Sequence, residues 1–85
     1  MAKIDVYTTH RCPYCVAAKK LLDEKGVAYE EHDVENDDAK RKWLVAASGQ
    51  RTVPQIFADG KPLGGFSDIA ALDRAGKLDA ILGLG

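Results

Sequence analysis

The strongest constraint on the fold is a strand–helix–strand pattern at the N-terminus. Residues 3–7 alternate polar and apolar side chains, which predicts a strand. After a polar loop, Pro13 suits the first turn of a helix that runs to about Lys25 and stops at Gly26. The apolar positions of this helix are Val16, Ala17, Leu21 and Leu22. The pattern of residues 27–34 predicts a second strand. The helix joins the two strands by a right-handed crossover, so we expect them to pair in parallel.

The middle of the chain predicts a second helix and a β-hairpin. Asn36-Asp37-Asp38 offers an N-cap and an acidic first turn for the helix. The apolar stripe of the helix, expected to pack inward, consists of Trp43, Leu44 and Ala47. Residues 55–58 and 61–63 predict two short antiparallel strands joined by the tight turn that Asp59-Gly60 favours. Pro62 indicates an edge position for the second of these strands.

The C-terminal part predicts a third helix and a final helical turn or two. Gly64-Gly65 allows positive φ before the helix, Ser67 is its expected N-cap, and Gly76 ends it. The side chains expected to face inward from these segments are Ile69, Leu72, Ala75, Leu78, Ile81 and Leu82. The element order is therefore βαβαββα, which predicts an α/β fold with a mixed four-stranded sheet flanked by helices.

Size and charge narrow the function classes. The 85 residues, of which 46% are hydrophobic and 29% charged, predict one globular domain over residues 1–85. Twelve basic residues against thirteen acidic ones leave a net charge of −1, so we expect neither a nucleic-acid partner nor a polybasic membrane contact. The N-terminus lacks the apolar stretch of a signal peptide, and no run reaches the roughly 18 apolar residues of a membrane helix. We therefore expect a cytoplasmic protein.

The reactive groups are concentrated in Cys12-Pro13-Tyr14-Cys15, which lies between a strand and a helix. In a reduced cytoplasm a structural disulfide is disfavoured, and so short a bridge would constrain little of the unfolded chain. The free N–H groups and the dipole of the helix start, with Arg11 and Lys19, should favour a thiolate at Cys12. Cys15, one turn further, is expected to be the less exposed sulfur and to attack a disulfide formed at Cys12. The pattern predicts a redox-active dithiol.

Two other uses of the cysteine pair remain open. Buried structural thiols would need no chemistry, but a Pro-Tyr spacer at a helix start is a poor core segment. A structural zinc site needs four ligands, of which the pair supplies two and His10 could supply a third. The chain has no second cysteine pair that could complete such a site, so redox chemistry explains the pattern better than zinc binding does.

Three motifs together resemble those of the dithiol glutaredoxins: Cys12-Pro13-Tyr14-Cys15, Thr52-Val53-Pro54 and Gly64-Gly65-Phe66-Ser67-Asp68. The resemblance covers nearly the whole chain and implies a thioredoxin-like fold. It implies a monomer that needs no metal and uses glutathione as reducing co-substrate. The partners it implies are disulfide-containing or glutathionylated proteins, with ribonucleotide reductase as one candidate. In this chemistry Cys12 is the nucleophile and Cys15 the resolving thiol.

The resemblance also implies a glutathione site. Its residues are Arg11, Tyr14, Arg41, Thr52, Val53, Pro54, Gly65, Phe66, Ser67 and Asp68. Tyr14 would flank glutathione, and Val53, before a cis peptide to Pro54, would offer its backbone N–H and C=O groups in the manner of an added strand. The start of the third helix would hold the γ-glutamyl carboxylate on its N–H groups, and Asp68 would accept from the ammonium group.

Two positions depart from the family pattern. Many relatives have a lysine where this chain has Thr9, and a small polar residue where it has Arg11. That lysine contacts the glycyl carboxylate of glutathione, so Arg11 and Arg41 would take over its role here. The departure leaves open a related protein that draws electrons from thioredoxin reductase. A carrier of a [2Fe–2S] cluster, held between two subunits through Cys12 and glutathione, is a further alternative that Pro13 disfavours.

Overall fold

The strands and helices follow one another in the predicted order, including the helical segment expected at the end of the chain. A computed structural model describes residues 2–84. Its elements are β1 (Ile4–Thr8), α1 (Pro13–Glu24), β2 (Glu30–Asp33), α2 (Asp38–Ser48), β3 (Gln55–Ala58), β4 (Lys61–Gly64), α3 (Phe66–Arg74) and α4 (Leu78–Leu82). No helix within this part of the chain is both long and apolar enough to cross a membrane.

The four strands form one mixed sheet in the order β2-β1-β3-β4. β1 pairs with β2 in parallel and with β3 in antiparallel orientation, and β3 continues through the hairpin into β4. Asp59 and Gly60 both have positive φ, as the predicted tight turn requires. Pro62 lies on β4 at the sheet edge, the position predicted for a strand that contains proline.

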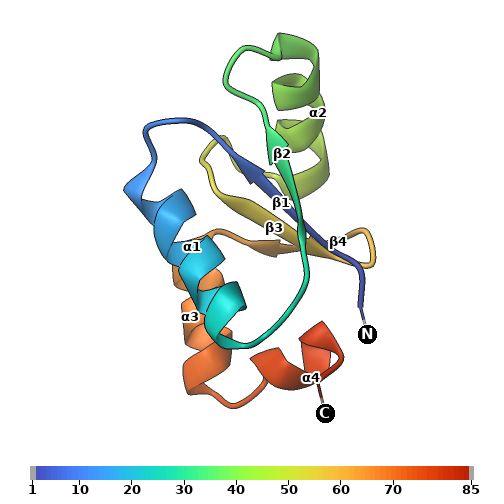
Figure 1. The fold of residues 1–85 in the computed structure, drawn as a ribbon. Coiled ribbons are helices and arrows are strands. Elements are labelled where there is room, and N and C mark those ends of the chain that lie inside the picture. Colours follow the sequence, from blue (N-terminus) through green and yellow to red (C-terminus); the bar gives the residue numbers. More distant parts are fainter. Residues whose placement is uncertain (1, 85) are drawn as a thin grey trace.

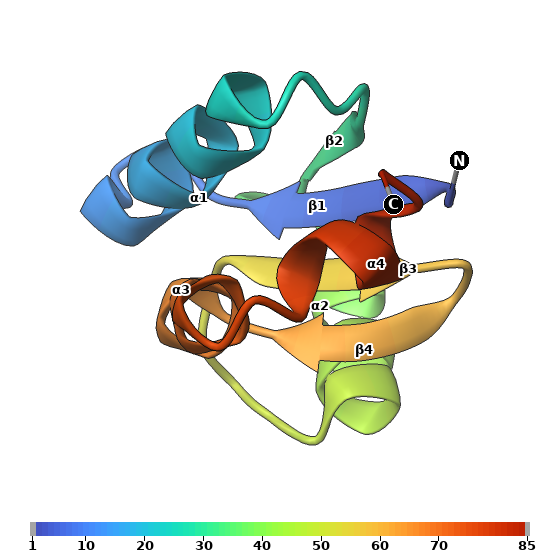
Figure 2. The ribbon, with the colours of Figure 1, turned by 90° about the horizontal axis from the view of Figure 1, so that it is seen from below.

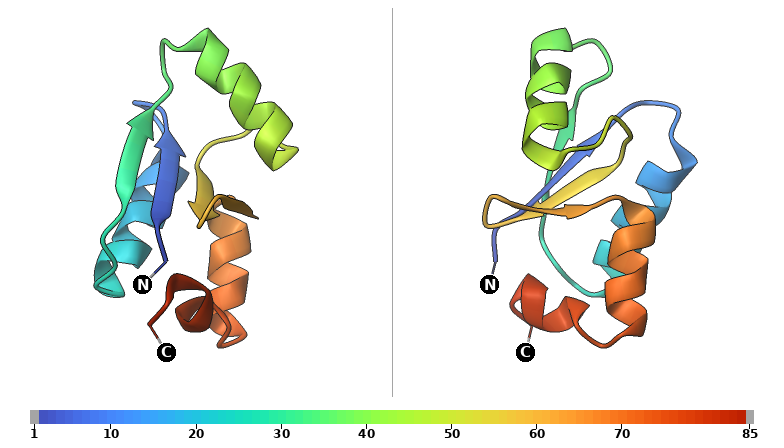
Figure 3. Two further views of the ribbon diagram at one scale, coloured as in Figure 1. Left: turned by 90° about the vertical axis from the view of Figure 1, so that its right-hand side faces the viewer. Right: turned by 180° about the vertical axis from the view of Figure 1, so that it is seen from behind.

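Helices cover both faces of the sheet (Figure 1). α1 and α3 lie on one face, α2 lies on the other, and α4 closes the end of the α1–α3 side below β1 (Figures 2 and 3). The larger apolar cluster lies under α1, α3 and α4 and consists of Ile4, Val6, Ala18, Leu22, Val27, Ile56, Ala58, Ile69, Leu78 and Leu82. The smaller cluster lies under α2 and consists of Tyr7, Val34, Leu44 and Phe57.

Several local expectations were wrong. Val16 is 61% exposed, because α1 turns Cys15, Ala18 and Leu22 towards the sheet instead. Trp43 is 48% exposed, although it packs against two aromatic rings of the smaller cluster. Ala75 is also exposed. The second strand is shorter than residues 27–34, since the Val27 N–H still bonds to a carbonyl at the end of α1.

The cap of α3 also differs from expectation. Gly65, not Ser67, is the N-cap residue, and Ser67 lies within the first turn of the helix. The reason is that the Asp68 carboxylate accepts a hydrogen bond of 2.9 Å from the Gly65 N–H, which starts the helix two residues earlier. Positive φ is needed at Gly64 (φ 107°), whereas Gly65 has φ −89°.

Candidate active site

The two cysteines lie at the N-terminus of α1, directly after the loop that follows β1. Cys12 is the N-cap residue, and its Sγ accepts a hydrogen bond of 3.1 Å from the Cys15 N–H. No acidic residue occupies the first turn of this helix. The sulfur of Cys12 therefore lies at the positive end of the helix dipole with a backbone donor aimed at it, an arrangement that stabilises a thiolate.

The two sulfurs differ in access to solvent. The structure contains the Cys12–Cys15 disulfide, with 5.1 Å between the two Cα atoms. Cys12 is partly exposed, whereas Cys15 is only 2% exposed and lies on the buried face of α1. An incoming thiolate or disulfide can therefore reach Cys12, while Cys15 is placed to react with a group already bonded to Cys12. This confirms the predicted difference in exposure.

A loop before β3 forms the wall beside Cys12. The Cys12 Sγ lies 3.6 Å from the Val53 carbonyl oxygen, and the Val53–Pro54 peptide bond is cis, as the resemblance implied. Gln55, fully buried on β3, donates from its side-chain amide to the Thr52 carbonyl (2.9 Å) and to the Gln50 Oε1 (2.9 Å). These bonds tie the loop to the sheet, so the wall is built on a buried anchor.

The start of α3 forms the opposite wall. A Cβ on Gly64 would clash with the Asp68 carboxylate, and a Cβ on Gly65 would lie 3.3 Å from the Pro54 carbonyl oxygen. The two glycines therefore let α3 approach the loop before β3 closely. The Asp68 carboxylate accepts a hydrogen bond from the Gly65 N–H. The N–H groups of the first helical turn after Gly65 remain as donors for an anion.

A groove of about 240 Å³ lies between these walls. Its lining residues are Tyr14, Gln50, Thr52, Val53, Pro54, Gly65, Phe66, Ser67 and Asp68. The rings of Tyr14 and Phe66 stack with 6.3 Å between their centroids, and Tyr14 is 66% exposed at the rim. The structure thus gathers in one groove every predicted glutathione residue except Arg11 and Arg41.

Gln50 was missed by sequence reasoning. It precedes the Thr52-Val53-Pro54 motif and carries no charge or reactive group that would mark it. Gln50 is held in the groove by its hydrogen bond to Gln55, and no local sequence pattern predicts that bond.

The two arginines lie outside the groove lining. Arg11 is exposed in the loop before Cys12. Arg41, on α2, donates from Nη1 to the Glu35 carbonyl oxygen at 3.5 Å and borders a shallow depression with Lys42, Val45 and Arg51. Their roles in binding the glycyl carboxylate stay predictions.

Lys19 and His10, two side chains close to the cysteine pair in the sequence, have other partners. Lys19 Nζ lies 3.0 Å from Glu31 Oε2, so its charge is partly neutralised. His10 Nε2 contacts the carboxylate of Asp33, and this hydrogen bond raises the pKa of the imidazole above its usual value. The stabilisation of a Cys12 thiolate therefore rests on the helix N-terminus more than on these side chains.

A thioredoxin-like sheet with an exposed and a buried cysteine at a helix N-terminus defines the class of thiol–disulfide oxidoreductases. The glutaredoxin family model matches residues 4–63. Glutaredoxin 3 of Escherichia coli K12 is 46% identical over 82 residues, which cover 96% of this chain and 99% of that protein. A probable glutaredoxin of Synechocystis is 48% identical over 82 residues, covering 95% and 93% of the two chains.

Solved structures agree with these sequence matches. A buckwheat glutaredoxin–glutathione complex superposes with a TM-score of 0.90 at 34% identity, covering 96% of this chain and 77% of that one. The glutaredoxin of Brucella melitensis superposes with a TM-score of 0.88 at 40% identity, covering 100% and 92%. The chain belongs to the glutaredoxin family and is a glutathione-dependent thiol–disulfide oxidoreductase.

Proposed function

We propose that this protein reduces protein disulfides by a dithiol mechanism and glutathione mixed disulfides by a monothiol mechanism, with the groove beside Cys12 as its glutathione site. The observation that carries the proposal is the position of the Cys12 sulfur. It is the accessible sulfur of the pair, it lies 3.6 Å from the Val53 carbonyl oxygen, and the groove-lining loop and helix start adjoin it. The buckwheat relative was solved with glutathione, which supports the choice of ligand.

In the dithiol mechanism, the Cys12 thiolate attacks a target disulfide and forms a mixed disulfide while one target thiolate leaves. The Cys15 thiolate then attacks the Cys12 sulfur, releases the second target thiolate and closes the Cys12–Cys15 disulfide. One glutathione thiolate opens this disulfide by bonding to Cys12. A second glutathione thiolate attacks the glutathione sulfur, leaves as glutathione disulfide and regenerates the dithiol.

Glutathione would lie along the groove. Val53 offers its backbone to the cysteinyl part as an added strand would. The free N–H groups at the start of α3 suit the γ-glutamyl carboxylate, and the Asp68 carboxylate suits the ammonium group beside it. Arg11 and Arg41 supply the positive charge near the glycyl end that Thr9 does not.

Two cysteine variants test the mechanism. Cys15→Ser should retain reduction of a glutathione mixed disulfide and lose reduction of a protein disulfide. Cys12→Ser should lose both activities. The assay couples reduced glutathione to glutathione reductase, with thioredoxin reductase as a parallel electron donor. Appreciable activity of Cys12→Ser, or turnover with thioredoxin reductase alone, would contradict the proposal.

Charge variants test the glutathione site. Asp68→Asn keeps an oxygen that can accept from the Gly65 N–H but removes the charge, so KM for the glutathionylated substrate should rise more than kcat falls. Arg11→Gln and Arg41→Gln should raise the same KM if they bind the glycyl carboxylate. Lys61→Gln, on the exposed side of β4 and outside the groove lining, is the matched control and should change neither constant.

The setting of the enzyme belongs to the same proposal. A glutathione-driven dithiol works where the glutathione pool is reduced, so we place the protein in the cytoplasm, acting as a monomer on oxidised or glutathionylated proteins such as ribonucleotide reductase. Sedimentation of the reduced protein should give the mass of one chain. A dimer that requires glutathione would contradict the monomer.

A further inference from the structure

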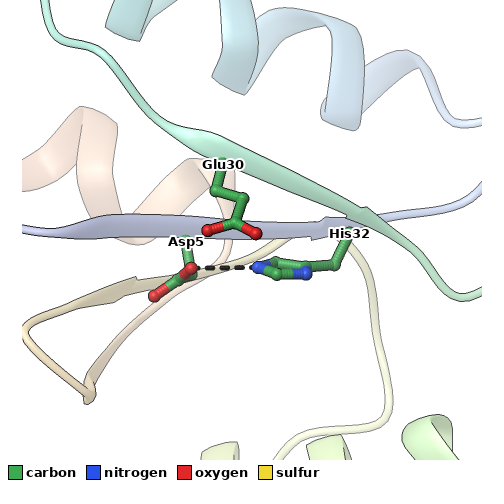
Figure 4. A group of neighbouring side chains, drawn as sticks. All are labelled: Asp5, Glu30 and His32. Atoms are coloured by element: carbon green, nitrogen blue, oxygen red, sulfur yellow. Dashed lines mark hydrogen bonds and ion pairs between the residues drawn. The ribbon is translucent and has the colours of Figure 1, made fainter.

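Three metal-ligating side chains converge on the sheet face that carries α2. His32 Nε2 lies 2.9 Å from Asp5 Oδ1, and one ligand atom from each of Asp5, Glu30 and His32 lies within 4.8 Å of the other two. Figure 4 shows the Glu30 carboxylate turned towards the other two side chains. Within residues 2–84, this is the only group of three or more histidine, cysteine or acidic residues placed so closely.

Strand register brings the three together. Asp5 on β1 pairs directly with Glu30 on β2, and His32 lies two residues further along β2 on the same face. Neighbouring strands are about 4.8 Å apart, which suits side chains that share one ion. The cluster is thus built on the backbone of two hydrogen-bonded strands rather than on a loop.

The histidine ring is held in place. It stacks on Tyr7 with 4.6 Å between the ring centroids and an interplanar angle of 17°. The side chains of His32 and Asp5 are 21% and 15% exposed, whereas Glu30 is open to solvent. A ring that is fixed before binding loses little freedom when it binds. An exposed third ligand leaves a route of entry and room for water.

Charge favours a cation. Two carboxylates and one imidazole bring a charge of −2 when the imidazole is neutral. Within the described residues, His32 is the one ion-pair partner of Asp5, and Glu30 forms no ion pair.

We propose that Asp5, Glu30 and His32 form a binding site for one divalent transition-metal ion, distinct from the dithiol. One imidazole nitrogen and two carboxylate oxygens suit Zn²⁺ and Cu²⁺, with water completing the coordination. The ion would replace the proton shared between His32 and Asp5 and would link β1 to β2.

A second histidine group has the same composition but a different geometry, which makes it a matched control. At His10, the Asp33 carboxylate contacts Nε2 while Glu35 lies 3.9 Å from Nδ1. Because the two carboxylates approach different ring nitrogens, they do not converge on one ion. At His32 both carboxylates converge with one ring nitrogen.

The test titrates Cu²⁺ into the untagged protein with the Cys12–Cys15 disulfide intact, so that no thiolate competes. Trp43 is the only tryptophan and lies one ring from the site, with 5.4 Å between its centroid and that of Tyr7. Paramagnetic Cu²⁺ should therefore quench its fluorescence, and electron paramagnetic resonance should show one nitrogen ligand at one ion per chain. Zn²⁺ should displace Cu²⁺ and reverse the quenching.

The variants decide between this site and others. His32→Gln should weaken Cu²⁺ affinity about 100-fold or more, since even the loss of a supporting contact to a ligand costs about 10–100-fold. Glu30→Gln, an exposed change that leaves the His32–Asp5 hydrogen bond intact, should also weaken it. His10→Gln should leave the affinity unchanged. Equal binding by His32→Gln and the parent, or loss of binding in His10→Gln, would overturn the proposal.

This inference is independent of the redox proposal. His32→Gln should retain turnover in the glutathione-coupled assay, because the residue lies outside the groove and the dithiol. Should His32→Gln unfold, Glu30→Gln still decides the question, since its carboxylate is exposed and makes no ion pair within the described residues.

Discussion

The two faces of the sheet are packed differently. The α1–α3–α4 face buries a continuous aliphatic cluster in which Leu22, Ile69 and Leu78 are completely inaccessible. The α2 face buries a smaller cluster in which two of the four side chains, Tyr7 and Phe57, are aromatic, and Trp43, which packs against both, stays 48% exposed. The same face carries the buried Gln55 amide and the polar group of Asp5, Glu30 and His32.

The difference shows where this small domain obtains its rigidity. Both helices that begin at the redox site, α1 and α3, are anchored in the larger cluster, so Cys12 and the α3 start are held by close packing. The α2 face contributes less buried apolar area and leaves polar groups partly accessible. We expect the first face to control stability and the geometry of the redox site, and the second to tolerate change.

The largest effect should come from the α1–α3–α4 cluster. Ile69→Ala removes a fully buried side chain that anchors α3, and it should lower the free energy of unfolding by about 3–4 kcal/mol. Urea unfolding followed by circular dichroism measures the change. Ile69→Val, which removes one methylene group, should cost about 1 kcal/mol. If Ile69→Ala cost no more than Ile69→Val, the larger cluster would not be closely packed.

A backbone change at the end of β4 should have the next largest effect. Gly64→Ala places a Cβ against the Asp68 carboxylate at a φ of 107° and disturbs the hydrogen bond to the Gly65 N–H. We expect a loss of about 2–3 kcal/mol in unfolding free energy and a raised KM for glutathione. Gly26→Ala also has a positive φ (70°) but meets no atom within 4 Å, so it should cost about 1 kcal/mol. Equal losses would mean that the contact with Asp68 adds nothing to the cost of a positive φ.

On the α2 face, truncation of the largest side chain should cost less than on the other face. Trp43 is half exposed, and its ring centroid lies 5.8 Å from that of Phe57 and 5.4 Å from that of Tyr7. Trp43→Ala should lower the free energy of unfolding by about 1–2 kcal/mol, from partial burial and the aromatic contacts. Glutathione-coupled turnover should not change. A loss as large as that of Ile69→Ala would remove the contrast between the faces.

The sequence predicts these faces unequally. Proline and glycine positions and local apolar patterns mark the order and most bounds of the elements, because those signals act within a few residues. The exposed Val16 and Trp43 escaped prediction, since the rotation of a helix against a sheet depends on distant residues. The cap of α3 by Asp68 depends on one hydrogen bond, and a helix start offers several candidates for that role.

The site shows the same division between local and distant information. The dithiol was predictable because strand, loop, cysteine pair and helix follow one another in the chain. Most groove residues were identified only through the family resemblance, since nothing local places residues 52–54 beside residues 65–68. The convergence of Asp5 with Glu30 and His32 depends on the register of β1 against β2. The alternation of polar and apolar residues does not determine this register, because a shift of two residues keeps every side chain on the same face of the sheet.

The smallest effect concerns a polar contact on the α1 side of the sheet. Glu31 Oε2 accepts a hydrogen bond of 2.8 Å from the buried Thr8 hydroxyl and lies 3.0 Å from Lys19 Nζ. The Thr8 hydrogen bond is the largest cause of a lowered Glu31 pKa; burial opposes it and Lys19 adds to it. A carboxyl group whose pKa is lower in the folded state stabilises the fold above its unfolded pKa, about 4.5, and loses this contribution as pH falls through the folded value.

The stability advantage of the parent over Glu31→Gln should therefore be largest near neutral pH and should shrink as pH falls below about 4.5. Urea unfolding of both proteins between neutral and acidic pH measures it. Because Glu31 is partly exposed, solvent screens the interaction and the advantage is small. In a Thr8→Val background, which lacks the hydroxyl donor, the pH dependence of the advantage should weaken. An advantage that grows towards acidic pH would show that the α1 side is not held by this ionised contact.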